Sequence, residues 1–394
     1  MFLVLVASAL VDSIGTYSVG NTILWSPKTP SSVDQSTIYN GTYYLSDRTN
    51  AGVHVVNLST NTQTALITGF VTNLVNGSLS PAVSGPNGLI ILPDRNEMYA
   101  GDGDGTIKVI DLFTNTVVAN ITTGSKKRAD EFGYDAETGT IVVTNPNEAT
   151  PYVSIINATT RTVTGKILFP NATELEQPVY DGTGKQFYVS VPSNPASPGG
   201  EIAILNLNNN TISKAYPIPQ CVPAGIVPGP PNTLFIGCSE AQITDYGYAA
   251  SFIMDLSTGN IISNISGVAG VDQVAYSALT GYFYASAYQD SPEPILAVIS
   301  SNGTLVQKIT TDNVTAHSVA VDQKSGVMVV PIKNKGMVVY DLGGGTSTTN
   351  SSSRNATATS SGGTTSSTTS VGERKLVCGL VLVGSLLVAG LMNL

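Results

Sequence analysis

The feature that most constrains the fold of this chain is a short pattern that occurs seven times. In each copy, alternating apolar residues lead to a polar residue and then to a turn, as in "VIDLFTNTVV". A period of two predicts β-strands, and self-similarity at intervals of 41 to 54 residues predicts a repeat architecture. The polar residues are Asn57, Asp111, Asn157, Asn206, Asp255, Ser300 and Asp341.

Each copy contains further strands. A stretch rich in aromatic and β-branched residues precedes every polar residue, as in "TYYLSD" and "QFYVSV", and an earlier one is clear in six copies and weaker in the first. Four strands per repeat predict an all-β fold, a seven-bladed β-propeller of four-stranded blades over residues 16–344. Tandem sandwiches, the rival all-β fold, would need about 100 residues per module.

The last copy predicts how the ring closes. It ends at Asp341 without a fourth strand, whereas "YSVGNTILWSP" near the start of the chain is apolar and belongs to no copy. We expect this N-terminal segment to supply the missing edge strand, because an unpaired edge would otherwise remain.

Several segments between about residues 36 and 342 resemble the YVTN-type seven-bladed propellers, which include secreted YncE-like proteins. The most specific are "VIDLFTNTVVANITTG", "KKRADEFGYD", "EQPVYDGTGKQFYVSVP", "PGGEIAILN" and "AHSVAVDQKSG". The resemblance implies a propeller that serves as a scaffold for binding a ligand or partner. It implies no particular chemistry, and lactonase-type propellers share only the architecture.

The two ends of the chain have the composition of targeting segments. Residues 1–15 are short and apolar and predict a secretory signal peptide, the alternative being a buried first strand. Residues 345–371 predict a Ser/Thr-rich stalk, and the apolar tail 372–394 predicts a removable GPI-attachment signal, the alternative being a retained membrane span. We expect attachment at Ser366 or nearby, between Gly363 and Ser367, which also suggests a eukaryotic, fungal source.

Sequons and cysteines agree with a secreted glycoprotein on the outer face of the plasma membrane or in the cell wall. Cys378 lies in the tail, so Cys221 and Cys238 remain, and their places in one hairpin predict a disulfide. Twelve Asn-X-Ser/Thr sequons predict N-glycosylation: Asn40, Asn57, Asn76, Asn120, Asn157, Asn171, Asn209, Asn264, Asn302, Asn313, Asn350 and Asn355.

Charge and missing motifs exclude several functions. The formal net charge of -9 argues against a nucleic-acid partner, which would require a basic face. The chain contains no GxSxG, HExxH, CxxC or Walker-type motif. We expect a monomer whose partner is an unknown surface ligand or protein.

Candidate binding residues come from the starts of the innermost strands, which meet at one mouth of a propeller. Carboxylates there could hold a divalent cation such as Ca²⁺, with Glu176, Asp130 and Asp272 as candidate ligands, or serve as acid and base. The alternative is a wet channel lined by polar residues. The candidates are Gln35, Asn87, Arg128, Asp130, Glu131, Glu176, Gln177, Asp272 and His317.

Two other features have structural interpretations. His54 lies within the strand "VHVVNL", where we expect a surface or inter-blade residue. The stretch "GDGDG" at residues 101–105 predicts a hairpin turn whose Asp102 and Asp104 make the mouth more acidic. Position twelve counted from Asp102 is Phe113, not the Glu that an EF-hand requires.

Three functions remain compatible with these sequence features. The first is a GPI-anchored, N-glycosylated surface propeller that binds a ligand or partner through its loop face. The second is an extracellular metal-dependent lactonase-like hydrolase that uses the acidic mouth. The third is a structural cell-wall glycoprotein.

Overall fold

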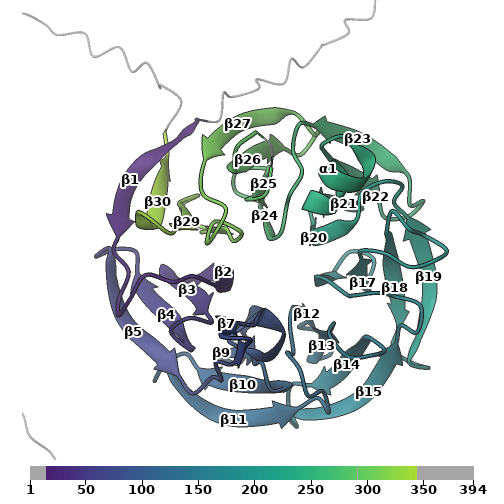
Figure 1. The fold of residues 1–394 in the computed structure, drawn as a ribbon, viewed down its shortest axis with the longest axis horizontal. Coiled ribbons are helices and arrows are strands. Elements are labelled where there is room, and N and C mark those ends of the chain that lie inside the picture. Colours follow the sequence, from purple (N-terminus) through teal and green to yellow (C-terminus); the bar gives the residue numbers. More distant parts are fainter. Residues whose placement is uncertain (1–14, 291, 344–394) are drawn as a thin grey trace, which may run out of the picture. The chain divides into compact units, whose positions relative to one another are not determined.

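Seven four-stranded antiparallel sheets surround a common centre in the computed structural model, which describes residues 15–290 and 292–343 (Figure 1). All of these residues belong to one unit of the chain, Met1–Thr346. The chain runs outwards through each sheet and then crosses to the innermost strand of the next. The predicted all-β, seven-bladed propeller is confirmed.

The first three blades follow the chain in order. Blade 1 contains β2 (Val33–Tyr39), β3 (Thr42–Asp47), β4 (Gly52–Asn57) and β5 (Thr62–Thr68). Blade 2 contains β8 (Leu89–Leu92), β9 (Glu97–Gly101), β10 (Thr106–Asp111) and β11 (Thr116–Thr122). Blade 3 contains β12 (Phe132–Asp135), β13 (Thr140–Asn145), β14 (Tyr152–Asn157) and β15 (Thr162–Leu168).

The next three blades repeat this order. Blade 4 contains β16 (Pro178–Asp181), β17 (Gln186–Val191), β18 (Glu201–Asn206) and β19 (Thr211–Pro217). Blade 5 contains β20 (Pro223–Pro228), β21 (Thr233–Cys238), β22 (Ala250–Asp255) and β23 (Ile261–Ser266). Blade 6 contains β24 (Val274–Ser277), β25 (Tyr282–Ala287), β26 (Ile295–Ser300) and β27 (Leu305–Thr310).

Blade 7 closes the ring with strands from both ends of the propeller. Its sheet contains β28 (Ala320–Val321), β29 (Met328–Ile332) and β30 (Gly336–Leu342), and β1 (Tyr17–Ile23) pairs with β30 as the outer strand. Tyr17 is the register partner of Leu342, and Ile23 is the partner of Met337. The predicted closure by the N-terminal strand is confirmed.

The hydrophobic core lies between neighbouring blades. Tyr99 and Ile107 of blade 2 pack with Ile141 and Ile156 of blade 3, and all four side chains are fully buried. Burial of each such side chain contributes about 1.5–3 kcal/mol. Since one face of each sheet is covered only by the next blade, the seven repeats stabilise one another.

The recurring polar residue caps the turn between the third and fourth strands. Asp111 Oδ1 accepts hydrogen bonds from the backbone N–H groups of Phe113 and Thr114, both at 2.8 Å. Asn157 Oδ1 accepts one from Thr160 at 2.9 Å, and Asp255 Oδ1 accepts one from Thr258 at 2.9 Å. Asn and Asp favour such turns because their short side chains bond to the backbone two or three residues on.

Two insertions interrupt the repeat, and the sequence pattern did not predict them. A small hairpin of β6 (Leu74–Val75) and β7 (Ser78–Leu79), followed by the 3-10 helix η1 (Pro81–Val83), lies between β5 and β8. The helix α1 (Glu240–Tyr246) lies between β21 and β22. The first insertion explains why the spacing from Asn57 to Asp111 is the longest of the six.

The predicted disulfide joins Cys221 to Cys238, whose Cα atoms are 4.8 Å apart. Cys221 precedes β20, and the register partner of Cys238 is Pro223, the first residue of that strand. The pairing of β20 with β21 shifts between Pro223 and Ile226, which no count along the sequence reveals.

Several predictions fall outside the described residues. They are the signal peptide apart from Gly15, the stalk 345–371, the tail 372–394, the attachment site near Ser366, and the sequons Asn350 and Asn355. Within residues 15–290 and 292–343, helices are too short or too polar to cross a membrane.

Candidate functional site

The starts of the innermost strands surround a pocket at one mouth of the ring. Its volume is about 290 Å³, and charged side chains from blades 1, 3, 4 and 6 reach it together with the imidazole of His317 from blade 7. The pocket residues are Ser31, Ser32, Asp34, Arg48, Pro81, Arg128, Asp130, Glu131, Glu176, Asp272, Gln273, Tyr288, Val314 and His317. Below, this pocket is called the acidic mouth.

The structure places the nine predicted site residues in two groups. Six of them line the acidic mouth: Arg128, Asp130, Glu131, Glu176, Asp272 and His317. Gln35, Asn87 and Gln177 do not line it, and they hold its surroundings together. Gln35 Oε1 accepts a hydrogen bond from Leu89 N at 2.8 Å, and Gln177 Oε1 accepts one from Ile226 N at 3.1 Å, so each amide joins neighbouring innermost strands.

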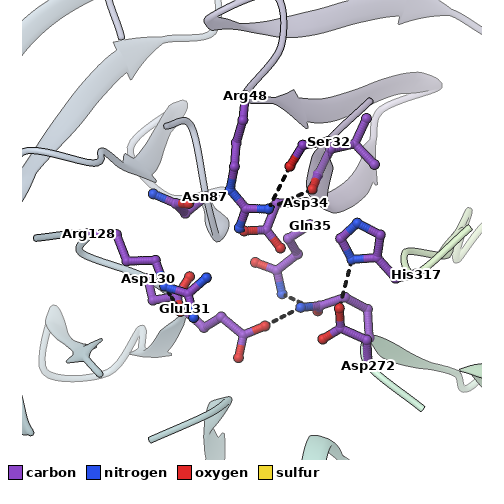
Figure 2. A network of polar contacts seen from close by, with 12 residues as sticks. Ser32, Asp34, Gln35, Arg48, Asn87, Arg128, Asp130, Glu131, Asp272 and His317 are labelled. Carbon is purple, nitrogen blue, oxygen red and sulfur yellow. Dashed lines mark hydrogen bonds and ion pairs between the residues drawn. The ribbon is translucent and has the colours of Figure 1, made fainter. Parts of the chain in front are cut away.

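Arg48 is the centre of a buried network on the blade 1 side (Figure 2). Its guanidinium donates to the Asp34 carboxylate, to Asn87 Oδ1 at 2.7 Å and to the Val33 carbonyl at 2.8 Å. These charge-assisted contacts neutralise Asp34 and fix the guanidinium plane. The loop after β3 therefore contributes a cation whose charge is already balanced.

Amide side chains also join blades across the channel (Figure 2). Gln35 Nε2 of blade 1 donates to Gln273 Oε1 of blade 6 at 3.2 Å, and Gln273 Nε2 donates to Glu131 Oε1 of blade 3. This chain of hydrogen bonds joins three blades that are far apart in sequence. It forms a polar floor and fixes one oxygen of Glu131.

Ion pairs of Arg128 and a hydrogen bond of His317 also lie in the acidic mouth. Arg128 Nε is 2.9 Å from Asp130 Oδ2, and a terminal nitrogen of Arg128 is 3.6 Å from Glu174. His317 Nδ1 is 2.7 Å from Asp272 Oδ2, and the His317 ring packs on Tyr288 with centroids 4.9 Å apart. The Asp272 contact orients the imidazole and leaves Nε2 as its second polar atom.

Burial and mutual repulsion raise the pKa values of three carboxyl groups in the acidic mouth. Burial raises the pKa of Glu131 well above its ordinary value, and the nearby Asp130, Asp272 and Asp34 add to the shift. Burial also raises the pKa of Glu176, to which Glu174, Glu131 and Asp272 contribute. For Asp130, burial raises the pKa to about 7, although Arg128 opposes the shift. An isolated acid on the surface experiences neither of these effects. Here several carboxyl groups share one site from which water is largely excluded.

Three charged or aromatic residues that line the acidic mouth were not predicted from the sequence. Asp34 immediately precedes the predicted Gln35, but a register shift between Val33 and Ser36 breaks the alternation of β2 there. Arg48 and Tyr288 follow β3 and β25, in loops that lie at the same mouth as the starts of the innermost strands. Inspection of those loops for charged and aromatic residues would have found both.

The hairpin at residues 101–105 has a structural role. Gly105 has a φ of +79°, as the turn prediction requires, but Gly103 is outside the positive-φ region. Asp102 is fully buried, and its Oδ1 accepts from Val71 N at 3.1 Å and from Gly103 N at 2.7 Å. Neither Asp102 nor Asp104 is among the described residues that line the acidic mouth, so the expected contribution of these residues to it is wrong.

His54 also has a structural role. Its side chain is completely buried in blade 1, where Nε2 is 2.8 Å from Asp47 Oδ2 and Nδ1 is 3.1 Å from Gln63 Oε1. The ring lies 6.2 Å from that of Trp25, in the segment that leads from blade 7 to blade 1. The surface alternative is wrong, and the inter-blade alternative agrees with this position.

Metal binding stays a prediction. Among residues 15–290 and 292–343, no three His, Cys, Asp or Glu side chains are grouped closely enough to hold a metal ion. Glu176, Asp130 and Asp272 all line the acidic mouth, but they approach it from blades 4, 3 and 6.

Comparisons with known proteins show the fold. No family model matches the chain, and no curated protein matches it. Similar solved structures include a chain of the mitotic checkpoint complex, with a TM-score of 0.63, 11% identity, and coverage of 84% of this chain and 94% of that one. The WD40 β-propeller domain of Doa1 has a TM-score of 0.62 and 13% identity, with coverage of 83% and 97%. Hydrazine synthase of Kuenenia stuttgartiensis has a TM-score of 0.63 and 11% identity, with coverage of 82% and 98%.

Proposed function

We propose that the chain is a cell-surface propeller that binds a ligand or partner through its acidic mouth. One observation carries the proposal: charged side chains from four blades and a histidine from a fifth converge on one pocket, where amide side chains bridge three blades. Propellers supply rigid scaffolds whose loops present binding residues. The converging residues are expensive to bury, which favours a binding role over simple packing.

The surface location rests on the sequence. We place the protein among YVTN-type propellers, secreted by a signal peptide, N-glycosylated and held at the outer membrane face or cell wall by a GPI lipid. The ten sequon asparagines within the described residues are exposed or half-buried, and the residues of the acidic mouth are not among them.

Release from cells tests the location. Phosphatidylinositol-specific phospholipase C should move the protein from the surface of intact cells into the medium, and peptide N-glycosidase F should then lower its apparent mass. Retention on the cells after phospholipase treatment, with a control GPI protein released, would contradict the lipid anchor.

A thermal-shift screen tests the binding role. The full chain, purified in detergent, is incubated with a chemically diverse library of small molecules, and a bound ligand raises the melting temperature by mass action. We expect stabilising compounds whose effect disappears in Asp272→Asn and persists in Glu137→Gln. Glu137 is an exposed residue, and it pairs with Lys185 at 2.7 Å. Compounds that stabilise both variants equally would place binding elsewhere and contradict the proposal.

A second candidate is an extracellular lactonase-like hydrolase. The observation that favours it is the His317–Asp272 pair at 2.7 Å inside the pocket, which resembles a base held by a carboxylate. Hydrolysis of simple lactones by the full chain, lost in His317→Gln and dependent on an added divalent metal, would support this candidate. Equal activity in His317→Gln would exclude a role for that histidine.

A further inference from the structure

We infer that the acidic mouth binds an organic cation, a ligand that carries a protonated amine or a similar nitrogen cation. The inference rests on the proposed function and adds the chemical class of the ligand. Three properties of the site lead to it: excess negative charge, a buried oxygen without a partner, and a wall made of two rings.

Acidic side chains outnumber guanidinium groups in the acidic mouth. Five carboxylates, Asp34, Asp130, Glu131, Glu176 and Asp272, face two guanidinium groups. Arg48 pairs with Asp34, and Arg128 pairs with Asp130. Glu131, Glu176 and Asp272 remain, and His317 is the polar partner of Asp272. A ligand that brings positive charge would pair with these acids in their ionised form.

Glu131 supplies an observation that does not depend on counting charges. Its residue is only 3% exposed, and it lines the pocket. Oε1 accepts from Gln273 Nε2, whereas Oε2 is buried and has no hydrogen-bond partner among the described residues. Figure 2 shows the carboxylate held by this one contact from the amide floor. A buried carboxylate oxygen normally has a donor, so a donor on a ligand would complete its contacts.

Two rings form part of the pocket wall. Tyr288 and His317 pack against each other with an interplanar angle of 38°, and both line the pocket. The phenol lies close enough to Asp272, Glu176 and Asp34 for their charges to raise its pKa, in addition to the effect of burial. An electron-rich ring beside carboxylates attracts ammonium and guanidinium groups through the face of the ring.

Size and spacing favour an organic cation over a bare metal ion. The pocket volume of about 290 Å³ exceeds what one ion fills. Within the described residues, acidic and histidine side chains are not grouped as metal ligands require. Carboxylates that surround a pocket from several blades suit a ligand with extended donors, such as a linear diamine.

Isothermal titration calorimetry with putrescine (1,4-diaminobutane) tests the inference on the full chain in detergent. We expect saturable binding at one site per chain for the diamine and none for the uncharged 1,4-butanediol. Glu131→Gln and Glu176→Gln, which keep the side-chain shape, should each weaken putrescine binding about tenfold or more, as expected when a charged hydrogen-bond partner is lost. Glu137→Gln should bind as the natural chain does.

Proton release provides an independent readout. Putrescine favours the ionised carboxylates, so binding at pH 7 should release protons from Glu131, Glu176 or Asp130, whose pKa values are raised. Affinity should increase by up to about tenfold per pH unit for each proton released. Titrations in buffers of different ionisation enthalpy measure that number directly, and it should decrease in Glu131→Gln.

Three outcomes would overturn the inference. They are binding of calcium chloride without binding of putrescine, equal affinity for putrescine and 1,4-butanediol, and putrescine binding that Glu131→Gln and Glu176→Gln leave unchanged. If anionic or neutral library compounds bind the acidic mouth and lose affinity in Asp272→Asn, the proposed function stands and only the ligand class is wrong. A melting temperature for each variant shows that it is folded.

Discussion

The two ends of the blades hold their carboxylates in different ways. At the end away from the acidic mouth, Asp181 accepts backbone N–H bonds from Thr183 at 3.0 Å and from Gly184 at 2.8 Å. At the acidic mouth, Glu131 accepts from one amide, and its second oxygen is without a hydrogen-bond partner among the described residues. Both residues are buried, at 6% and 3% exposure. Burial alone therefore does not distinguish a structural acid from one available to a ligand.

The carboxyl groups at the two ends of the blades also differ in the direction of their pKa shifts. Backbone and hydroxyl donors lower the pKa of Asp111, led by Thr114, and of Asp255, led by Ser257. Burial and neighbouring acids raise the pKa of Glu131 and Glu176. The turn carboxylates thus stabilise the fold when they are ionised, and the carboxylates of the acidic mouth stabilise it when they are protonated.

The largest predicted effect is on the pH dependence of stability. Between about pH 4, where unfolded carboxyls titrate, and the raised folded values, which include about 7 for Asp130, the native state binds more protons than the unfolded state. The free energy of unfolding should therefore fall as pH rises from 5 to 8, by about 1.4 kcal/mol per pH unit for each proton. Below pH 4 the lowered pKa values of Asp111 and Asp255 reverse the sign, so stability falls as pH falls. Urea unfolding at several pH values measures both limbs, and stability that increases steadily from pH 5 to 8 would show that the acidic mouth does not hold carboxyl groups with raised pKa values.

A substitution at the turn end should destabilise the protein. Asp181→Ala removes the acceptor for two backbone N–H groups of the turn, and each such hydrogen bond contributes about 0.5–1.5 kcal/mol. Denaturant unfolding at pH 7 measures the loss. Asp181→Asn keeps one acceptor oxygen and should lose less, and a larger loss in Asn than in Ala would contradict this account.

The matched substitution at the acidic mouth should have the opposite sign and a smaller size. Glu131→Gln keeps an acceptor for Gln273 and removes a buried negative charge from beside Asp130 and Asp272. We expect it to stabilise the unliganded protein at pH 8 by about 1 kcal/mol, the lower end of the cost of burying an unpartnered polar group. A melting temperature below that of the natural chain would show that Glu131 is a structural acid like Asp181.

The fold could be predicted from the repeat because the contacts that shape each blade join residues close together in the chain. The turn cap that Asp111 forms with Phe113 and Thr114 involves neighbours in the chain, so it leaves a visible signature. Ring closure could also be predicted, since a seventh repeat without its fourth strand requires a partner for β30. The insertions that contain β6, β7 and α1 follow no repeat and had no such signature.

The candidate site could be predicted only in part, because its contacts join residues of different blades across the ring. The position just before an innermost strand predicted Glu131, Glu176, Asp272 and His317, which do line the pocket. It could not show that Gln273 bonds to Glu131 across 142 residues of sequence. Nor could it separate Gln35, which joins blades 1 and 2, from its neighbour Asp34, which faces the pocket.

The closure of blade 7 has a mechanical consequence. Tyr17 and Leu342 are register partners at one end of the β1–β30 pair, so the chain enters and leaves the propeller at the same point. A force applied between these two residues loads a single antiparallel pair from its end and breaks its hydrogen bonds one after another. The other six blades bear almost none of that load. Under tension the ring would therefore open at β1 by peeling, at a lower force than if the same strands were sheared along their length.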